Sequence, residues 1–182
     1  MIFFRRNAIK EAIDANLDAD FSVFACGANA PNEAVICAFE TQLGYSLPKD
    51  FRKFSMSEYG GIYIEVKEAF WPKAKPLEVG PFWSFLRGMM TYGFANDVPD
   101  WLDMRKQTEE FQKHTGTRLA PFLKIIGDAD VYCFDERAVI RRWDHETGEA
   151  QIVEKSFEVV FAEELAELKK RKEKKKAGAK NI

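Results

Sequence analysis

The segment Leu43–Glu65 constrains the fold more than any other stretch, because it combines a helix end, a second helix and the start of a strand. Gly44 suits the left-handed position just past a helix end, and Pro48 suits the first turn of the next helix, where its missing N–H costs nothing. Beyond the Gly60–Gly61 pair, apolar and polar residues alternate. This period of two predicts a strand with one buried face.

Apolar residues recur at helical spacing in several segments. Within 49–55, Phe51 and Phe54 are three residues apart and share one face. Pro31 and Glu33 mark another helix start, and Pro99 and Gly116 bracket a third helix. We therefore expect helices at 7–16, 31–43, 49–55, 99–115 and from 157 onward. The mixed segment 18–30 is predicted to be a loop.

Beginning at Leu119, the sequence contains four short apolar runs separated by turn residues. They are 119–126, 131–135, 139–144 and 150–153, which is typical of an antiparallel meander. The run Phe82–Phe94 is too uniformly apolar for periodicity to decide between strand and helix, and we expect it to be buried. The predicted fold class is α+β, with a mainly antiparallel sheet of about five or six strands and helices packed around it.

A chain of 182 residues is long enough for one well-filled core. We expect one domain over residues 1–168, followed by a basic helix end or tail at 169–182. That tail holds eight of the 27 basic residues and one of the 29 acidic residues, which leaves the body with 19 and 28, a net charge of −9. Because the extension lacks an apolar face, only its root is expected to pack, and its end should fray.

The three cysteines, Cys26, Cys37 and Cys133, indicate neither a disulfide framework nor a zinc cluster. We expect reduced, mostly buried thiols. No apolar run is long enough for a signal-peptide core or a membrane span. The predicted location is cytoplasmic.

No catalytic motif of a hydrolase, kinase or dinucleotide-binding enzyme is present. Asp128, Asp130 and Asp135 lack the glycine that a calcium loop requires, because Cys133 stands at its sixth position. Asp144 and His145, with Glu146 and Glu149 nearby, form the best enzymatic cluster, but consecutive strand residues point to opposite faces. Cys133 lies between two aromatic residues and is expected to be an inert core thiol.

The order of residues around the first segment resembles the N-terminal signature of the SUKH superfamily. The matching residues are Glu40, Leu43, Gly44, Leu47, Pro48, Phe51, Tyr59, Gly60 and Gly61. A second match covers 122–135 and 139–145, where Val139, Trp143, Asp144 and His145 resemble a "valine, aromatic, acid, His" strand end. Ala129 departs from the glycine that is usual in the first of these turns. Residues 76–116 look like an elaboration of the compact domain.

The resemblance implies a non-enzymatic protein-binding domain without a cofactor or metal. The superfamily includes the yeast cell-wall assembly regulator and many bacterial immunity proteins. The first hypothesis is an immunity protein that neutralises a cognate toxin, possibly a nuclease, whose basic surface an acidic body would attract. The expected partner-binding residues are Glu40, Tyr59, Asp135, Trp143 and Asp144. Neither nucleic acid nor a membrane is expected as the main partner.

Two alternatives remain open. The first alternative is a regulatory or scaffold domain like the eukaryotic relatives that the sequence also resembles. The basic tail would then serve as a docking arm. The other alternative is a metal-dependent hydrolase centred on Asp144 and His145. For Glu40, the residue pattern leaves two interpretations: a carboxylate that orders the helix junction, or one that faces a partner.

Overall fold

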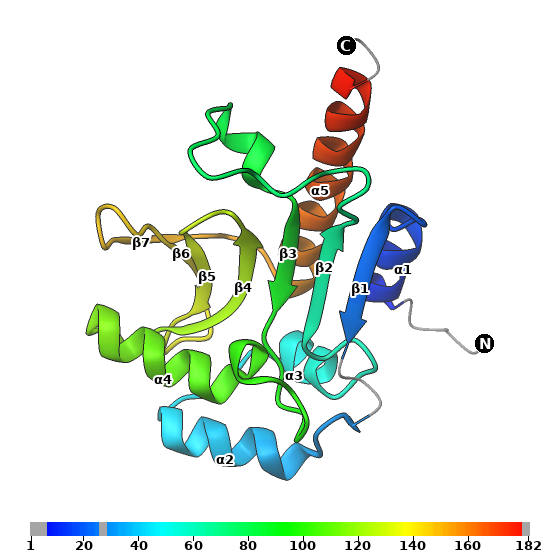
Figure 1. Cartoon of the computed structure of the whole chain (residues 1–182). Coiled ribbons are helices and arrows are strands. Elements are labelled where there is room, and N and C mark those ends of the chain that lie inside the picture. Colours follow the sequence, from blue (N-terminus) through cyan, green and yellow to red (C-terminus); the bar gives the residue numbers. More distant parts are fainter. Residues whose placement is uncertain (1–6, 26–28, 180–182) are drawn as a thin grey trace, which may run out of the picture.

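The computed structural model describes residues 7–25 and 29–179 and contains one antiparallel sheet with helices around it (Figure 1). The seven strands are arranged in chain order, each paired with the next one along the chain. The predicted α+β class is confirmed, with one or two strands more than expected. The strands are β1 (Phe21–Ala25), β2 (Ile62–Val66), β3 (Gly88–Thr91), β4 (Ala120–Ile126), β5 (Val131–Phe134), β6 (Ile140–Trp143) and β7 (Ala150–Ile152).

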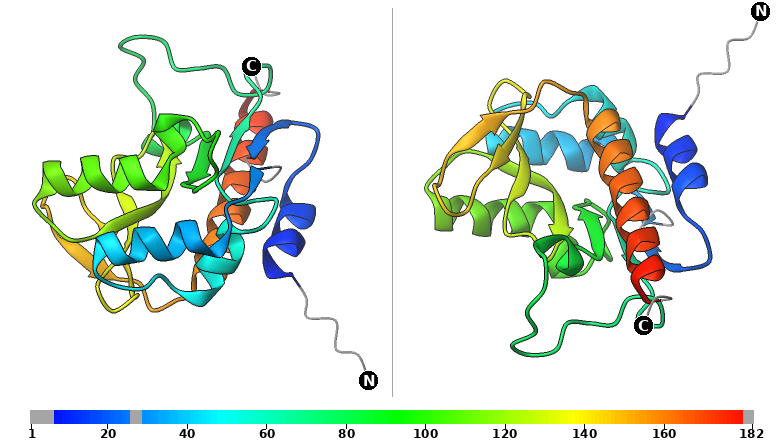
Figure 2. Two further views of the ribbon diagram at one scale, coloured as in Figure 1. Left: turned by 90° about the horizontal axis from the view of Figure 1, so that it is seen from below. Right: turned by 90° about the horizontal axis from the view of Figure 1, so that it is seen from above.

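The helices occupy both sides and one end of this sheet. The long helix α5 passes behind β2 and β3 and packs along α1, whereas α4 packs against β4 (Figures 1 and 2). The helices are α1 (Ala8–Asn16), α2 (Glu33–Leu43), α3 (Lys49–Ser55), α4 (Met104–Thr115) and α5 (Phe157–Ala179), with short 3₁₀ helices η2 (Phe82–Phe85) and η3 (Asp100–Leu102).

The predicted helix junction is confirmed. Gly44 adopts φ = 85° at the end of α2, and Pro48 occupies the N-cap of α3, one residue before the first helical turn. Gly60 lies so close to the end of α3 that a Cβ there would come within 2.3 Å of the Ser55 carbonyl oxygen. The backbone therefore turns tightly into β2, whose burial alternates as predicted.

The rings of Phe51 and Phe54 anchor α3 in the core. Phe51 lies 4.9 Å from Phe134 and 5.1 Å from Phe157, centroid to centroid, so that it joins α3 to β5 and α5. Phe122 of β4 stacks on Phe134 at 4.0 Å. Because aromatic pairs add to the free energy of burial, this cluster fixes how the two halves of the chain meet.

Three local predictions differ from the structure. The segment 18–30, expected to be a loop, contains the edge strand β1. Only one residue of β1 is buried, so its sequence lacks the alternation of apolar and polar residues that predicts a strand. The run Phe82–Phe94 divides into η2 and β3, and Phe82 is exposed rather than buried. The helix expected at 99–115 is interrupted, because Asp103 caps α4 after the separate turn η3.

The basic end of α5 packs against the protein, contrary to the expectation that only its root would do so. Lys172 is 1% exposed and forms ion pairs with Asp18 and Asp20. Lys176 pairs with Asp20 at 2.6 Å, and the Lys174 ammonium lies 4.2 Å from the centre of the Trp83 ring. Lysine stems cover apolar surface while their ammonium groups find carboxylates or aromatic faces, so a helix can pack without an apolar stripe.

The described cysteines are free: Cys133 is buried as expected, but Cys37 is exposed on α2. Cys26 lies outside the described residues. Within residues 7–25 and 29–179, no helix has the length and apolar character needed to cross a membrane.

Candidate functional site: one face of the sheet

A single row of directly paired residues crosses all seven strands. Residues opposite one another in an antiparallel pair project from the same face, so the row lies on one side of the sheet. The other face packs on α5, where the Tyr132 hydroxyl donates a hydrogen bond to Glu164. The row, called the face row below, consists of Phe24, Tyr63, Met90, Lys124, Val131, Trp143 and Ala150.

An exposed aromatic cluster forms one end of the face row. Trp101 of η3 packs edge-on against Tyr63, with ring centroids 5.5 Å apart, and lies 6.4 Å from Phe24. Trp101 is 48% exposed and Phe24 is 46% exposed. The three rings line an open depression of about 490 Å³. They are called the aromatic cluster below.

Polar groups orient the aromatic cluster. The Tyr63 hydroxyl donates a hydrogen bond of 2.8 Å to Glu65, and Glu65 also pairs with Arg87 at 3.1 Å. Burial, together with this hydrogen bond to Glu65, raises the pKa of Tyr63 to about 12. Tyr63 therefore presents a neutral, fixed ring at physiological pH.

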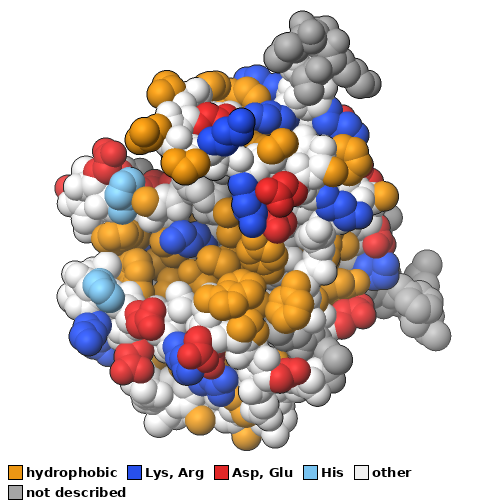
Figure 3. Space-filling model, viewed as in Figure 1, with side chains coloured by type: hydrophobic (Ala, Val, Ile, Leu, Met, Phe, Trp, Pro, Cys, Tyr) orange, Lys and Arg blue, Asp and Glu red, His pale blue; other side chains and the backbone are white. Residues whose placement is uncertain are grey.

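A cavity of about 280 Å³, called the α4 cavity below, lies at the other end of the face row. Three members of the row, Lys124, Val131 and Trp143, line it from the sheet, and α4 closes it from the other side. The Trp143 ring packs edge-on against Phe111 of α4 at 5.1 Å. In Figure 3, hydrophobic side chains gather along a hollow that crosses the middle of the molecule in the view of Figure 1. The molecule thus offers an extended, largely apolar surface with aromatic rings at both ends.

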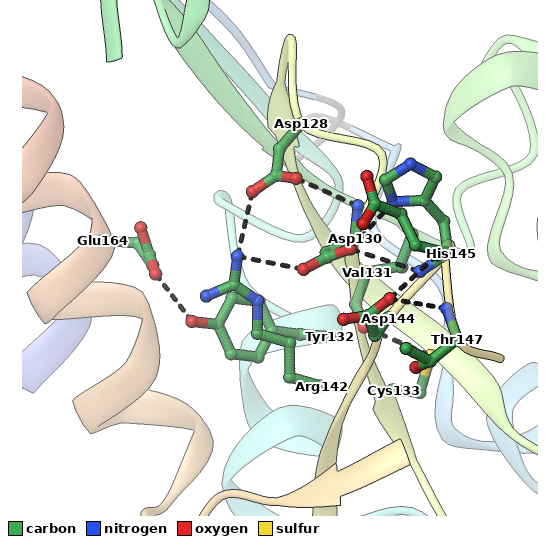
Figure 4. A network of polar contacts seen from close by, with 11 residues as sticks. Asp128, Asp130, Val131, Tyr132, Cys133, Arg142, Asp144, His145, Thr147 and Glu164 are labelled. Atoms are coloured by element: carbon green, nitrogen blue, oxygen red, sulfur yellow. Dashed lines mark hydrogen bonds and ion pairs between the residues drawn. The ribbon is translucent and has the colours of Figure 1, made fainter. Parts of the chain in front are cut away.

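The second candidate site is a polar network around the β4–β5 and β6–β7 turns (Figure 4). Arg142 pairs with Asp128 at 3.0 Å and with Asp130 at 3.3 Å. Asp130 also accepts a hydrogen bond at 3.1 Å from His145 Nδ1, and this bond raises the pKa of His145. The network ties the two turns together.

Within the described ranges, Asp130, Asp144 and His145 offer ligand atoms that all lie within 4.8 Å of one another. The turn thus brings together two residues that strand alternation would have separated. However, Asp130 is already paired with Arg142, and Asp144 accepts the backbone N–H groups of Glu146 and Thr147 at 2.8 and 2.9 Å. Those N–H groups lower the pKa of Asp144. Hydrogen bonding within the turns accounts for these side chains without a cation.

The structure assigns internal bonds to three of the five residues predicted to bind a partner. Glu40 is buried and accepts the Leu47 N–H at 2.7 Å and Arg52 at 2.6 Å, so it orders the α2–α3 junction. Asp135 accepts the N–H groups of Arg137 and Val139 and pairs with Arg141 at 2.8 Å. Although partial burial opposes it, these bonds lower the pKa of Asp135. Asp144 likewise accepts hydrogen bonds from backbone N–H groups of its own turn.

The remaining two predicted residues, Tyr59 and Trp143, lie in different places. Tyr59 is half-buried in the turn after α3, near Lys10 of α1. Trp143 belongs to the face row and lines the α4 cavity. The five predicted residues therefore do not form one surface, and Trp143 alone among them lies on the face row.

Sequence reasoning missed the aromatic cluster. Tyr63 was detectable in part, because it alternates with the buried residues Ile62 and Ile64 and must face away from the core. Phe24 lies in the segment predicted to be a loop, and Trp101 lies in the segment predicted to be one continuous helix, 99–115. Only the pairing of β1 with β2 and the break at Asp103 bring the three rings together.

Comparison with known families agrees with this architecture. The model of the SMI1 / KNR4 family (SUKH-1) matches residues 30–163, which is most of the chain. The chain belongs to this family. Membership supports a protein-binding role at the level of the family. Among curated proteins, no match to this chain is found.

Proposed function

We propose that this protein binds another protein through the face row, and that the partner is a cognate bacterial toxin which the protein neutralises by direct contact. The observation that carries the proposal is the aromatic cluster: the half-exposed rings of Trp101 and Phe24 beside the partly exposed ring of Tyr63, whose hydroxyl is bonded to Glu65. Such rings are enriched among the residues that dominate binding energy at protein interfaces. An exposed cluster beside an apolar hollow is also unusual for a surface without a partner.

Charge supports the choice of partner. The body outside 169–182 has 28 acidic and 19 basic residues, which favours encounter with a basic protein. A nuclease toxin must carry a basic surface to bind its substrate. Aromatic contacts would then supply affinity, and the net negative charge of residues 1–168 would accelerate association.

The test is co-expression with candidate toxins chosen from the products of neighbouring genes, scored by cell survival and by the dissociation constant of the purified complex. Trp101→Ala and Tyr63→Ala should each weaken binding by about 2 kcal/mol or more, roughly 30-fold. Phe82→Ala is the matched control, because Phe82 is an aromatic residue that is 60% exposed on η2 and outside the face row. Equal losses from all three variants, or none, would refute the assignment of the interface.

The scaffold alternative, with the basic tail as a docking arm, is weakened by the contacts of α5. Lys172 is buried, and Lys174 and Lys176 lie over aromatic rings. Deleting 169–182 would therefore disturb folding as well as docking. The variant Lys170→Gln removes one exposed charge and leaves Lys172, Lys174 and Lys176 in place. Loss of partner capture in this variant, with Trp101→Ala unaffected, would favour the scaffold function.

The hydrolase alternative has one geometric argument, the convergence of Asp130, Asp144 and His145. Metal analysis of the purified protein, alone and after incubation with Mn²⁺ or Zn²⁺, tests it directly. Stoichiometric metal that is lost in Asp144→Asn would support this alternative over the binding proposal.

A further inference from the structure

The α4 cavity contains polar groups that the fold leaves without partners. It is partly open to solvent and is lined by residues of α4, β4, β5 and β6 and by Tyr92, which follows β3. At about 280 Å³ it is close to the lower end of the range for small-ligand pockets, about 300–1,000 Å³. Its size suits a single small molecule or a single side chain.

Lys124 is the central cation of this cavity. It stands in the face row between Met90 and Val131, is half-buried, and makes no hydrogen bond or ion pair with any residue in the described part of the chain. Several other basic groups in half-buried positions, such as Arg52, Arg87 and Arg141, have carboxylate partners. An ammonium group that no carboxylate of the described residues pairs with favours an anion.

Tyr92 supplies a second unused donor. Its side chain is 4% exposed and lines the cavity, yet its hydroxyl has no hydrogen-bond partner within residues 7–25 and 29–179. The hydroxyl oxygen itself is reachable from the cavity, whereas the indole N–H of Trp143, which also lines the cavity, is fully buried and has no hydrogen-bond partner among the described residues. Burial, with a smaller effect from the nearby Cys133 and Glu110, raises the pKa of Tyr92, so the hydroxyl keeps its proton and remains a donor.

The walls of the cavity add an apolar and aromatic component. Phe111 and Trp143 meet edge to face at an interplanar angle of 81°, and Pro121 and Val131 are buried beside them. One acidic group, Glu110, also lines the cavity from the exposed side of α4, and His114 lies one turn further along. Glu110 opposes an anion, so its removal should have the opposite effect from removal of Lys124.

We propose that the α4 cavity binds a small organic carboxylate with an apolar or aromatic body. Lys124 pairs with the carboxylate, the Tyr92 hydroxyl donates a hydrogen bond to it, and Phe111 and Trp143 enclose the apolar part. The cavity shares Lys124, Val131 and Trp143 with the face row, but none of its residues belongs to the aromatic cluster, so ligand binding can be tested without the toxin partner.

The test uses benzoate as the probe, with benzamide and benzylamine as matched neutral and cationic analogues. Binding to the full-length protein is followed by the amide and indole N–H resonances in a two-dimensional NMR titration. Trp143→Phe identifies the indole signal of Trp143. Benzoate should shift this signal saturably, with a dissociation constant on the order of 1 mM, as expected for so small a ligand. Neither analogue should saturate in the same range.

Three variants separate recognition from general loss of structure. Lys124→Met should weaken benzoate binding about tenfold or more, and Tyr92→Phe about fivefold, following typical values for charged and neutral hydrogen bonds. Glu110→Gln should strengthen binding by about twofold or more, because it removes a repulsive charge. Lys113→Met, which removes an exposed lysine of α4 outside the cavity, should have no effect. A well-dispersed spectrum for each variant confirms folding.

Equal binding of benzoate and benzamide, or unchanged affinity in Lys124→Met, would overturn the proposal. It would equally be overturned if no saturable shift of the Trp143 indole occurred at millimolar benzoate. Opposite effects of Lys124→Met and Glu110→Gln cannot arise from destabilisation, and they are the result that supports the site.

Discussion

Glu40 provides the sharpest test of how this fold is held together. Its side chain is 9% exposed, and one carboxylate oxygen accepts the Leu47 N–H while the other lies 2.6 Å from Arg52. The substitution Glu40→Gln keeps an oxygen for Leu47 but removes the charge opposite Arg52. Arg52 then retains the Cys37 sulfur at 3.6 Å and the carboxylate of Glu33, whose side chain is 70% exposed and therefore contributes little.

The magnitude follows from this geometry. Removing one partner of a fully buried ion pair costs about 3–5 kcal/mol, but Arg52 is 20% exposed and keeps access to water. The value for a hydrogen bond to a charged group, about 1.5–3 kcal/mol, is therefore the better guide. We expect Glu40→Gln to lower the free energy of unfolding by about 2 kcal/mol and Tm by about 4–8 °C for a chain of this size. Glu40→Ala should cost about 1–3 kcal/mol more, because the Leu47 N–H loses its acceptor.

Chemical and thermal unfolding monitored by circular dichroism would measure these changes. Glu33→Gln serves as the control and should change the free energy of unfolding by less than about 0.5 kcal/mol. A double-mutant cycle of Glu40→Gln with Arg52→Gln should show that the two effects are strongly non-additive. An unchanged stability for Glu40→Gln, combined with weaker partner binding, would contradict the structural role and favour the original hypothesis of a partner-facing acid.

Three further predictions concern other charged and reactive groups. Replacing Lys172, which is 1% exposed, by Met should destabilise the protein by about 2–4 kcal/mol because Asp18 and Asp20 lose a shared cation, whereas Lys170→Met should be nearly neutral in the same unfolding assay. His145 should titrate above pH 6.5 in an NMR experiment and return toward that value in Asp130→Asn; because its folded-state pKa is raised, its stabilising contribution is complete below the unfolded pKa and is lost as the pH rises through the folded pKa. Burial raises the pKa of Cys133, so in a Cys26→Ser/Cys37→Ser background its thiol should react with Ellman's reagent only on unfolding, and rapid labelling of the native protein would show that β5 is not closed.

The regular parts of the fold were predictable because local signals and tertiary structure agree there. Gly44, Pro48 and the Gly60–Gly61 pair mark the ends of α2, α3 and the start of β2, and each has the conformation that its residue type favours. The meander from β4 to β7 was predictable because its turns contain residues that favour tight chain reversal. In these segments the local sequence is enough to predict the structure, without information about contacts with distant residues.

The rest depended on contacts between segments far apart in the chain. β1 has no buried face of its own and becomes a strand only through pairing with β2. The packing of Lys172 required Asp18 and Asp20, which lie more than 150 residues away in the sequence. The aromatic cluster likewise combines β1, β2 and η3. Periodicity identifies which face of an element is apolar, but it does not reveal which exposed side chains of different elements meet.

The central claim is that the aromatic cluster on the face row binds the partner. The most direct measurement is calorimetric titration of the toxin found in the co-expression test with the wild-type protein, Trp101→Ala and Phe82→Ala. We expect Trp101→Ala to weaken binding roughly 30-fold while unfolding at the same temperature as the wild type, and Phe82→Ala to bind normally. Wild-type affinity in Trp101→Ala would contradict the claim.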